Sequence, residues 1–128
     1  MSDLNKPEPP PTAGEGAECW PLVIASSPWS DATKADMLAR DALGRERYGT
    51  PLHVWNGRDA AIDAYQECLD LRVYLMQVQA RLVLAGSRAH PGTVDALSRV
   101  GTLTGTVGAA VEWLGALARS GVVPKEKP

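Results

Sequence analysis

Apolar residues that recur every three or four positions in the last third of the chain restrict the fold more than any other feature. They are Leu97, Val100, Leu103, Val107, Val111, Leu114 and Leu117. This spacing places them on one side of an α-helix, which turns once in about 3.6 residues. Pro91-Gly92 precedes the segment, and Gly121 stands where a left-handed residue commonly ends a helix. The sequence therefore predicts a long helix from about Thr93 to about Ser120.

The same signals predict a first helix over residues 31–48. Ser30 or Asp31 can cap its start, because short polar side chains accept hydrogen bonds from the free N–H groups of a first turn. Gly49 provides the left-handed stop. This segment is therefore expected to be a helix with a signal at each end.

A second helix is expected to begin after Asn56 and to continue to about Leu84. Asn56 and Asp59 are spaced as in a capping box, and Gly86 can end the helix. Apart from an acidic stripe, with Gln66 and Gln77 at its edge and Arg81 at its far end, almost all of its side chains are apolar. This is typical of a helix in the centre of a bundle.

The remaining segments carry no comparable pattern. Residues 1–18 are rich in proline and acids, so we expect a flexible leader. Residues 19–29 contain two prolines and are expected to be an extended arm, with 22–24 the only strand-like stretch. Residues 122–128 should fray. We expect an all-α fold with a flexible Pro-rich N-terminal arm, a three-helix core in one domain over residues 19–121, and completion by oligomerisation.

Four glycines lie within the third predicted helix: Gly101, Gly105, Gly108 and Gly115. Glycine lowers helix stability, so its repeated use suggests a helix backbone pressed against a neighbour. We expect this glycine-lined face to hold at least a dimer together.

Composition and charge exclude several classes of protein. The formal charge is −2, with 13 basic and 15 acidic residues, so we expect no dedicated DNA or RNA binding. Cys19 and Cys68 fit neither a zinc site nor a disulfide scaffold. No signal peptide is visible, and no stretch has the apolar density of a membrane span. We expect a cytoplasmic protein, in the host cytoplasm if a phage encodes it.

An acidic stripe marks the second predicted helix: Asp59, Asp63, Glu67 and Asp70 fall within about 80° of one another on the helical wheel. Carboxylates crowded in this way repel unless a cation lies among them, and oxygen ligands on adjacent turns suit Mg²⁺. The functional interpretation is a magnesium site that handles a nucleotide. The alternative, which the pattern alone favours, is a solvent-facing strip of an amphipathic helix.

The segment Tyr65-Gln-Glu-Cys-Leu-Asp-Leu-Arg-Val-Tyr-Leu75 resembles the second half-motif of the MazG-like all-α nucleoside triphosphate pyrophosphohydrolases. The likeness extends over about Asp36 to Gln77, a block that is also similar to small bacteriophage and prophage proteins grouped with that superfamily. In the superfamily, a Glu-x-x-Asp on one helix joins a Glu-Glu-x-x-Glu on the preceding helix to bind Mg²⁺.

The resemblance implies that Glu67 and Asp70 are metal ligands, that Asp63 is a further ligand or base, and that Asp63 and Glu67 are catalytic. The sequence departs from the family pattern in the preceding helix, where no Glu-Glu-x-x-Glu occurs. A partner chain or Glu112 is then needed to complete the ligand set.

The loop before the second helix holds the candidate nucleotide-binding residues Trp55, Asn56 and Arg58. Free N–H groups at a helix start attract phosphate, Trp55 is suited to stack on a base, and Arg58 is suited to pair with a phosphate. The alternative for each is structural: Trp55 packs the loop, Asn56 caps the turn, and Arg58 pairs with nearby acids.

Three functions follow from these patterns. The first is nucleotide binding with Mg²⁺, and pyrophosphohydrolysis between the α- and β-phosphates if the protein is active as the resemblance implies. The second is a non-catalytic viral oligomer that sequesters a nucleotide signal, as counter-defence proteins do. The third is a structural helical oligomer whose acidic stripe is only solvated.

Overall fold

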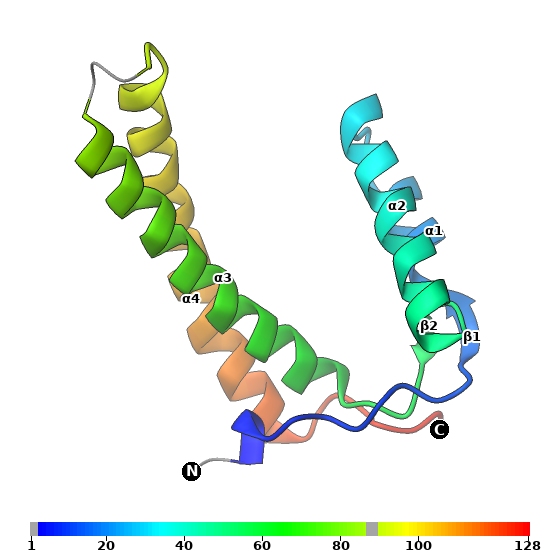
Figure 1. The fold of residues 1–128 in the computed structure, drawn as a ribbon. Helices are drawn as coiled ribbons and strands as arrows, with labels where there is room; N and C mark the ends of the chain where they lie inside the picture. Colours follow the sequence, from blue (N-terminus) through cyan, green and yellow to red (C-terminus); the bar gives the residue numbers. More distant parts are fainter. Residues whose placement is uncertain (1–2, 87–89) are drawn as a thin grey trace. The chain divides into compact units, whose positions relative to one another are not determined.

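The structure is a computed structural model that describes residues 3–86 and 90–128. Its fold is all-α, as predicted, and adds one small two-stranded sheet (Figure 1). In chain order the elements are η1 (Asp3–Asn5), β1 (Glu15–Glu18), α1 (Cys19–Ala25), α2 (Asp31–Tyr48), β2 (His53–Trp55), α3 (Ala60–Ala85) and α4 (Thr93–Ser120). The described residues thus contain four α-helices where the sequence predicts three.

The chain splits into two compact units by its contacts, and the expected single domain over residues 19–121 remains a prediction. Unit 1 contains residues 1–6 and 60–123, and unit 2 contains residues 7–59 and 124–128. Each unit is described by itself below.

The predicted cap at Ser30 and the predicted glycine stops of the three long helices are confirmed. The Ser30 hydroxyl accepts a hydrogen bond from the Thr33 N–H at 3.2 Å, which satisfies a free donor in the first turn of α2. Gly49, Gly86 and Gly121 all have a positive φ, between 69° and 72°, directly after a helix. Residues other than glycine rarely adopt this backbone conformation, so these three glycines end α2, α3 and α4 as predicted.

The start of α3 differs from the prediction. This helix begins at Ala60, and the turn before it is closed by the Asn56 side chain, whose Oδ1 accepts from the Arg58 N–H at 3.2 Å. The Asp59 N–H donates to Glu8 Oε2 at 3.1 Å. A carboxylate of the leader therefore lies at the positive start of α3.

Two predictions in the N-terminal half are wrong. Residues 19–25 form helix α1, although the prolines led us to expect an extended arm, and the strand-like stretch 22–24 lies within this helix. Pro21 occupies the first turn of α1, where its missing N–H costs no hydrogen bond. The actual strands are β1 and β2, which pair antiparallel with Glu15 opposite Trp55 and Glu18 opposite His53.

In unit 2, these strands and the leader gather around the segment before α3. The Thr12 N–H donates to the Asn56 carbonyl at 2.9 Å, and the Cys19 N–H donates to the Leu52 carbonyl at 2.8 Å. Helix α1 packs against α2, and the Trp29 indole N–H donates to the Val23 carbonyl at 2.9 Å. The described part of the leader, residues 3–18, thus includes η1 and β1, although it lacks an apolar pattern.

In unit 1, α3 and α4 form an antiparallel hairpin (Figure 1). The side chains of α3 that are buried or half-buried along the seam repeat at alternating spacings of four and three: Ala61, Tyr65, Cys68, Arg72, Leu75, Gln79 and Leu82. Those of α4 follow the same rule: Thr93, Leu97, Val100, Thr104, Val107, Val111, Leu114 and Ala118. This repeat is typical of helices that pack along a coiled-coil seam.

The seam between α3 and α4 buries few apolar side chains. The buried apolar residues of the described chain are Leu4, Ala61, Leu75 and Val107, all in unit 1. Leu4 is held there because the Gln66 amide donates to the Leu4 carbonyl at 2.6 Å and to the Lys6 carbonyl at 3.0 Å. Among the described residues, we find no helix whose length and apolar character would let it cross a membrane.

The glycines of α4 behave differently from one another. A Cβ built on Gly115 would lie 2.9 Å from Cε2 of Tyr65, so the two helices approach closely at this point. A Cβ built on Gly101, Gly105 or Gly108 would meet no described atom within 4 Å. Among the described residues, the predicted close approach is therefore confirmed at Gly115 alone.

Candidate functional site

The acidic stripe lies along one side of α3. Asp63 is half-buried near the start of the helix, and Glu67 and Asp70 are exposed one and two turns later. Asp59 directly precedes the helix and belongs to unit 2 by its contacts. Since a helix rises about 1.5 Å per residue, Asp63 and Asp70 are separated by about 10 Å along the axis.

These carboxylates do not by themselves make a magnesium site. No group of three His, Cys, Asp or Glu side chains that could hold a metal ion occurs within residues 3–86 and 90–128. Glu112 is exposed on α4 and completes no such group with the stripe. One helix presents its ligands from one direction only, and an octahedral Mg²⁺ needs them from several. The ligand set implied by the resemblance would therefore need carboxylates from a second chain.

The three candidate nucleotide-binding residues are held by the chain itself. Trp55 is half-buried in β2, and a Cβ on Gly16 would lie 3.2 Å from its Cδ1. The Asn56 side chain accepts from the Arg58 N–H, and the Arg58 guanidinium donates to the Pro9 carbonyl. These contacts fit the structural alternatives for Trp55 and Asn56, whereas this Arg58 contact is to a backbone carbonyl rather than to the nearby acids that its alternative named. The nucleotide-binding role remains a prediction.

The two halves of the predicted site belong to different units. Asp63, Glu67 and Asp70 lie in unit 1, whereas Trp55 and Arg58 lie in unit 2. Because the resemblance spans both units in sequence, it groups residues that fold in separate local environments.

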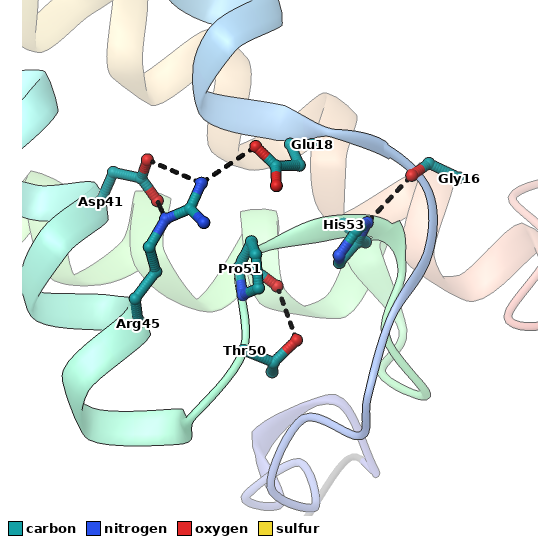
Figure 2. A network of polar contacts seen from close by, with 7 residues as sticks. All are labelled: Gly16, Glu18, Asp41, Arg45, Thr50, Pro51 and His53. Atoms are coloured by element: carbon teal, nitrogen blue, oxygen red, sulfur yellow. Dashed lines mark hydrogen bonds and ion pairs between the residues drawn. The ribbon is translucent and has the colours of Figure 1, made fainter.

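A charged network that the sequence analysis did not single out lies in unit 2 (Figure 2). Arg45 Nε donates to Asp41 Oδ1 at 3.0 Å, and its Nη2 donates to Glu18 Oε2 at 2.9 Å. The hydrogen bond to Asp41, and then that to Glu18, raise the pKa of Arg45 above its usual range. The i, i+4 spacing of Asp41 and Arg45 could have revealed the first pair, but Glu18 is brought in by β1.

The basic residues near this network do not form one open phosphate site. Arg45 is neutralised by two carboxylates, and Arg47 lies over the Tyr48 ring at 5.3 Å. A shallow, open depression on α2 is lined by Arg40, Leu43, Glu46 and Arg47, so an acid shares it with two cations. This surface is mixed in charge rather than basic.

The remaining reactive side chains are engaged or partly shielded. His53 Nδ1 lies 2.9 Å from the Gly16 carbonyl, so this nitrogen carries a proton and donates (Figure 2). Burial raises the pKa of the Cys19 thiol, which disfavours the nucleophilic thiolate. The Cys68 thiol lies 3.9 Å from the Val107 carbonyl in the α3–α4 seam. His53 and Cys68 thus have structural partners. Cys68 directly follows Glu67 of the acidic stripe, but its thiol lies in the α3–α4 seam.

Comparison with known proteins adds no relative. No protein-family model, curated protein or solved structure matches the chain.

Proposed function

We propose that this protein binds a nucleotide together with Mg²⁺ through the acidic stripe of α3, as an assembly of more than one chain. The observation that supports this is the alignment of Asp63, Glu67 and Asp70 along one side of a helix on which most other residues are apolar. Aligned carboxylates repel along one helix, and a bound divalent cation relieves that repulsion. The second chain is needed because the described residues supply no three-ligand set.

The roles of the residues follow the resemblance to the MazG-like enzymes. Glu67 and Asp70 are ligands, Asp63 is a further ligand or a base, and an active protein would release a nucleoside monophosphate and pyrophosphate. Trp55, Asn56 and Arg58 would bind the base and phosphates. The Pro9 carbonyl already accepts from Nη1 of Arg58, so a phosphate would compete with it for that donor.

The test is incubation of the full chain with a panel of nucleoside triphosphates and Mg²⁺, followed by separation of the products. We expect monophosphate and pyrophosphate, and we expect Asp70→Asn to lower turnover at least 100-fold while the molecular mass of the assembly stays unchanged. Asp36→Asn, which removes an exposed acid of α2 outside the stripe, is the matched control. Wild-type levels of turnover in Asp70→Asn would contradict the assigned role.

A second candidate is a helical oligomer that does not act on nucleotides. It is favoured by the large apolar side chains that α3 leaves exposed, among them Val73, Tyr74 and Met76, each more than half exposed. If a nucleotide binds and is recovered intact, the protein is a sequestering module. If no nucleotide of the panel raises the melting temperature, the structural oligomer is the remaining function.

We place the protein in the cytoplasm, or in the host cytoplasm if a phage encodes it, because nucleoside triphosphates and Mg²⁺ occur together there.

A further inference from the structure

Helix α3 has more apolar surface than its partners in unit 1, α4 and η1, cover. The seam with α4 uses the residues at positions such as 68, 72, 75 and 79. The residues one position before these are rotated by about 100° to one side of the seam, and those one position after are rotated equally to the other side. Both sides carry exposed apolar side chains, so α3 is only partly buried within unit 1.

We use the name Tyr74 face for the side of the hairpin that is formed by the residues one position before each seam residue. On α3 it contains Leu71, Tyr74 and Val78, which are 42%, 59% and 44% exposed. On α4 the corresponding exposed residues are Leu103 and Trp113, at 46% and 64%. Because the two helices are antiparallel, residues that precede the seam on each helix lie on the same side of the hairpin. The five apolar side chains thus share one side of the hairpin, together with the exposed Arg99 and Thr106 of α4.

This surface is large enough for a stable contact. An aromatic side chain carries about 150–250 Å² of surface, so the exposed fractions of the five residues correspond to on the order of 500 Å². A standard protein interface buries about 800 Å² on each partner, and the alanines and backbone that flank these residues supply the remainder. Tyrosine and tryptophan are also the residues that most often dominate binding energy at interfaces.

The charges on the Tyr74 face identify its partner. Glu67 precedes Tyr74 by seven residues, and Arg81 follows it by seven residues, on the same side of α3. Both side chains belong to exposed residues, and neither forms an ion pair with another described residue. A second α3 that crosses antiparallel about Tyr74 places its Arg81 opposite Glu67 and its Glu67 opposite Arg81. The face is therefore complementary to itself, as a two-fold interface requires.

We propose that two copies of this chain pair through the Tyr74 face, with α3 antiparallel to α3 of the second copy and Glu67 paired with Arg81 at each end. The two hairpins then form a four-helix bundle in which Leu71, Tyr74 and Val78 are covered. This interface is not the glycine-lined face that the sequence suggested, because Gly101, Gly105 and Gly108 each lie one position after a seam residue, on the other side of α4. The dimer does not need nucleotide, but it pairs the Glu67 carboxylate with Arg81 of the second copy, so Mg²⁺ bound by Glu67 would compete with this ion pair.

The opposite side of α3 provides the matched control. Val73 is 59% exposed, the same fraction as Tyr74, but lies on the other side of the helix. That side also holds Met76 and Val83, and its α3 positions carry no charged residue that would fix the register of a partner. Tyr74→Glu and Val73→Glu therefore place the same charge on neighbouring residues of equal exposure.

The experiment measures molecular mass by light scattering and sedimentation, without nucleotide and with a chelator present. We expect a wild-type dimer at micromolar concentration, a monomer for Tyr74→Glu and a dimer for Val73→Glu. Glu67→Arg and Arg81→Glu should each weaken the dimer by about tenfold, because each substitution occurs twice and creates like-charged pairs. The double variant Glu67→Arg/Arg81→Glu should restore the wild-type dissociation constant.

Several outcomes would overturn the proposal: a wild-type monomer, a dimer split by Val73→Glu and not by Tyr74→Glu, or a double variant no tighter than the single variants. A dimer that forms only with Mg²⁺ would also overturn it, and would instead favour a shared metal site. If Tyr74→Glu unfolds, the variants Glu67→Arg, Arg81→Glu and their combination still test the interface. The melting temperature of the wild type should also rise with protein concentration, because dimerisation stabilises the folded state. Failure of nucleotide turnover leaves all these readouts unaffected.

Discussion

The ring of Tyr65 on α3 lies directly against the backbone of Gly115 on α4. A Cβ at position 115 would be 2.9 Å from Cε2 and 3.3 Å from Cζ of that ring, closer than packed carbon atoms lie. The guanidinium of Arg119 covers the same ring at 5.7 Å. This is the one glycine of α4 at which a described side chain of the neighbouring helix leaves no room for a methyl group.

Gly115→Ala should therefore destabilise the protein by about 1 kcal/mol. Overpacking costs about 1–3 kcal/mol, and the better helix propensity of alanine offsets up to about 1 kcal/mol of it. Gly108→Ala is the control, because its Cβ would meet no described atom within 4 Å, and it should stabilise by about 0.5–1 kcal/mol. Urea unfolding measures both. Equal stabilisation by the two substitutions would show that Tyr65 does not contact Gly115.

Leu75→Ala should be among the most damaging substitutions in unit 1. Leu75 is 7% exposed in a core of few buried side chains, and truncation of a buried leucine costs about 2–5 kcal/mol. Leu84, on the same helix, is 85% exposed, so Leu84→Ala should change the free energy of unfolding by less than about 0.5 kcal/mol. Circular dichroism at 222 nm during thermal unfolding distinguishes the two. A similar melting temperature for both variants would mean that Leu75 is not part of the core.

Glu8→Ala should destabilise the leader and the start of α3. The Glu8 carboxylate accepts from the Asp59 N–H at 3.1 Å, at the positive end of the helix. Loss of a capping acceptor costs about 0.5–2 kcal/mol. Glu46→Ala removes an exposed acid of α2 and should have little effect. Amide hydrogen exchange at residues 59–62 should accelerate in Glu8→Ala alone; unchanged exchange there would contradict the contact.

Cys19 should react slowly with alkylating reagents at pH 8. Burial raises its pKa above the ordinary value of 9.0, so less thiolate is present than on an unburied cysteine. We expect the alkylation rate, measured by mass spectrometry in a Cys68→Ser background, to lie below that of glutathione and to keep rising above pH 9. The folded state disfavours this thiolate, so the stability contributed here is present below pH 9 and is lost as the pH rises through the raised pKa. A rate equal to that of glutathione would contradict the burial of Cys19.

The acidic stripe of α3 was predictable because the relation between Asp63, Glu67 and Asp70 is set by helix periodicity alone. Whether those carboxylates meet other ligands depends on contacts between segments far apart in sequence. The same holds for Arg58, whose bond to the Pro9 carbonyl joins residues 49 positions apart. The loop residues had suitable chemistry for phosphate, but their sequence neighbourhood carries no sign that the leader would engage them.

The sequence by itself determined the three long helices and their ends. Ser30, Gly49, Gly86 and Gly121 act on backbone groups within a few residues of themselves, so their effect is independent of the rest of the fold. The tertiary structure decided the pairing of β1 with β2, the helical state of residues 19–25 and the division into two units. These features depend on which distant segment supplies hydrogen bonds and apolar contacts. A short segment with weak local preference takes the conformation that its partners stabilise.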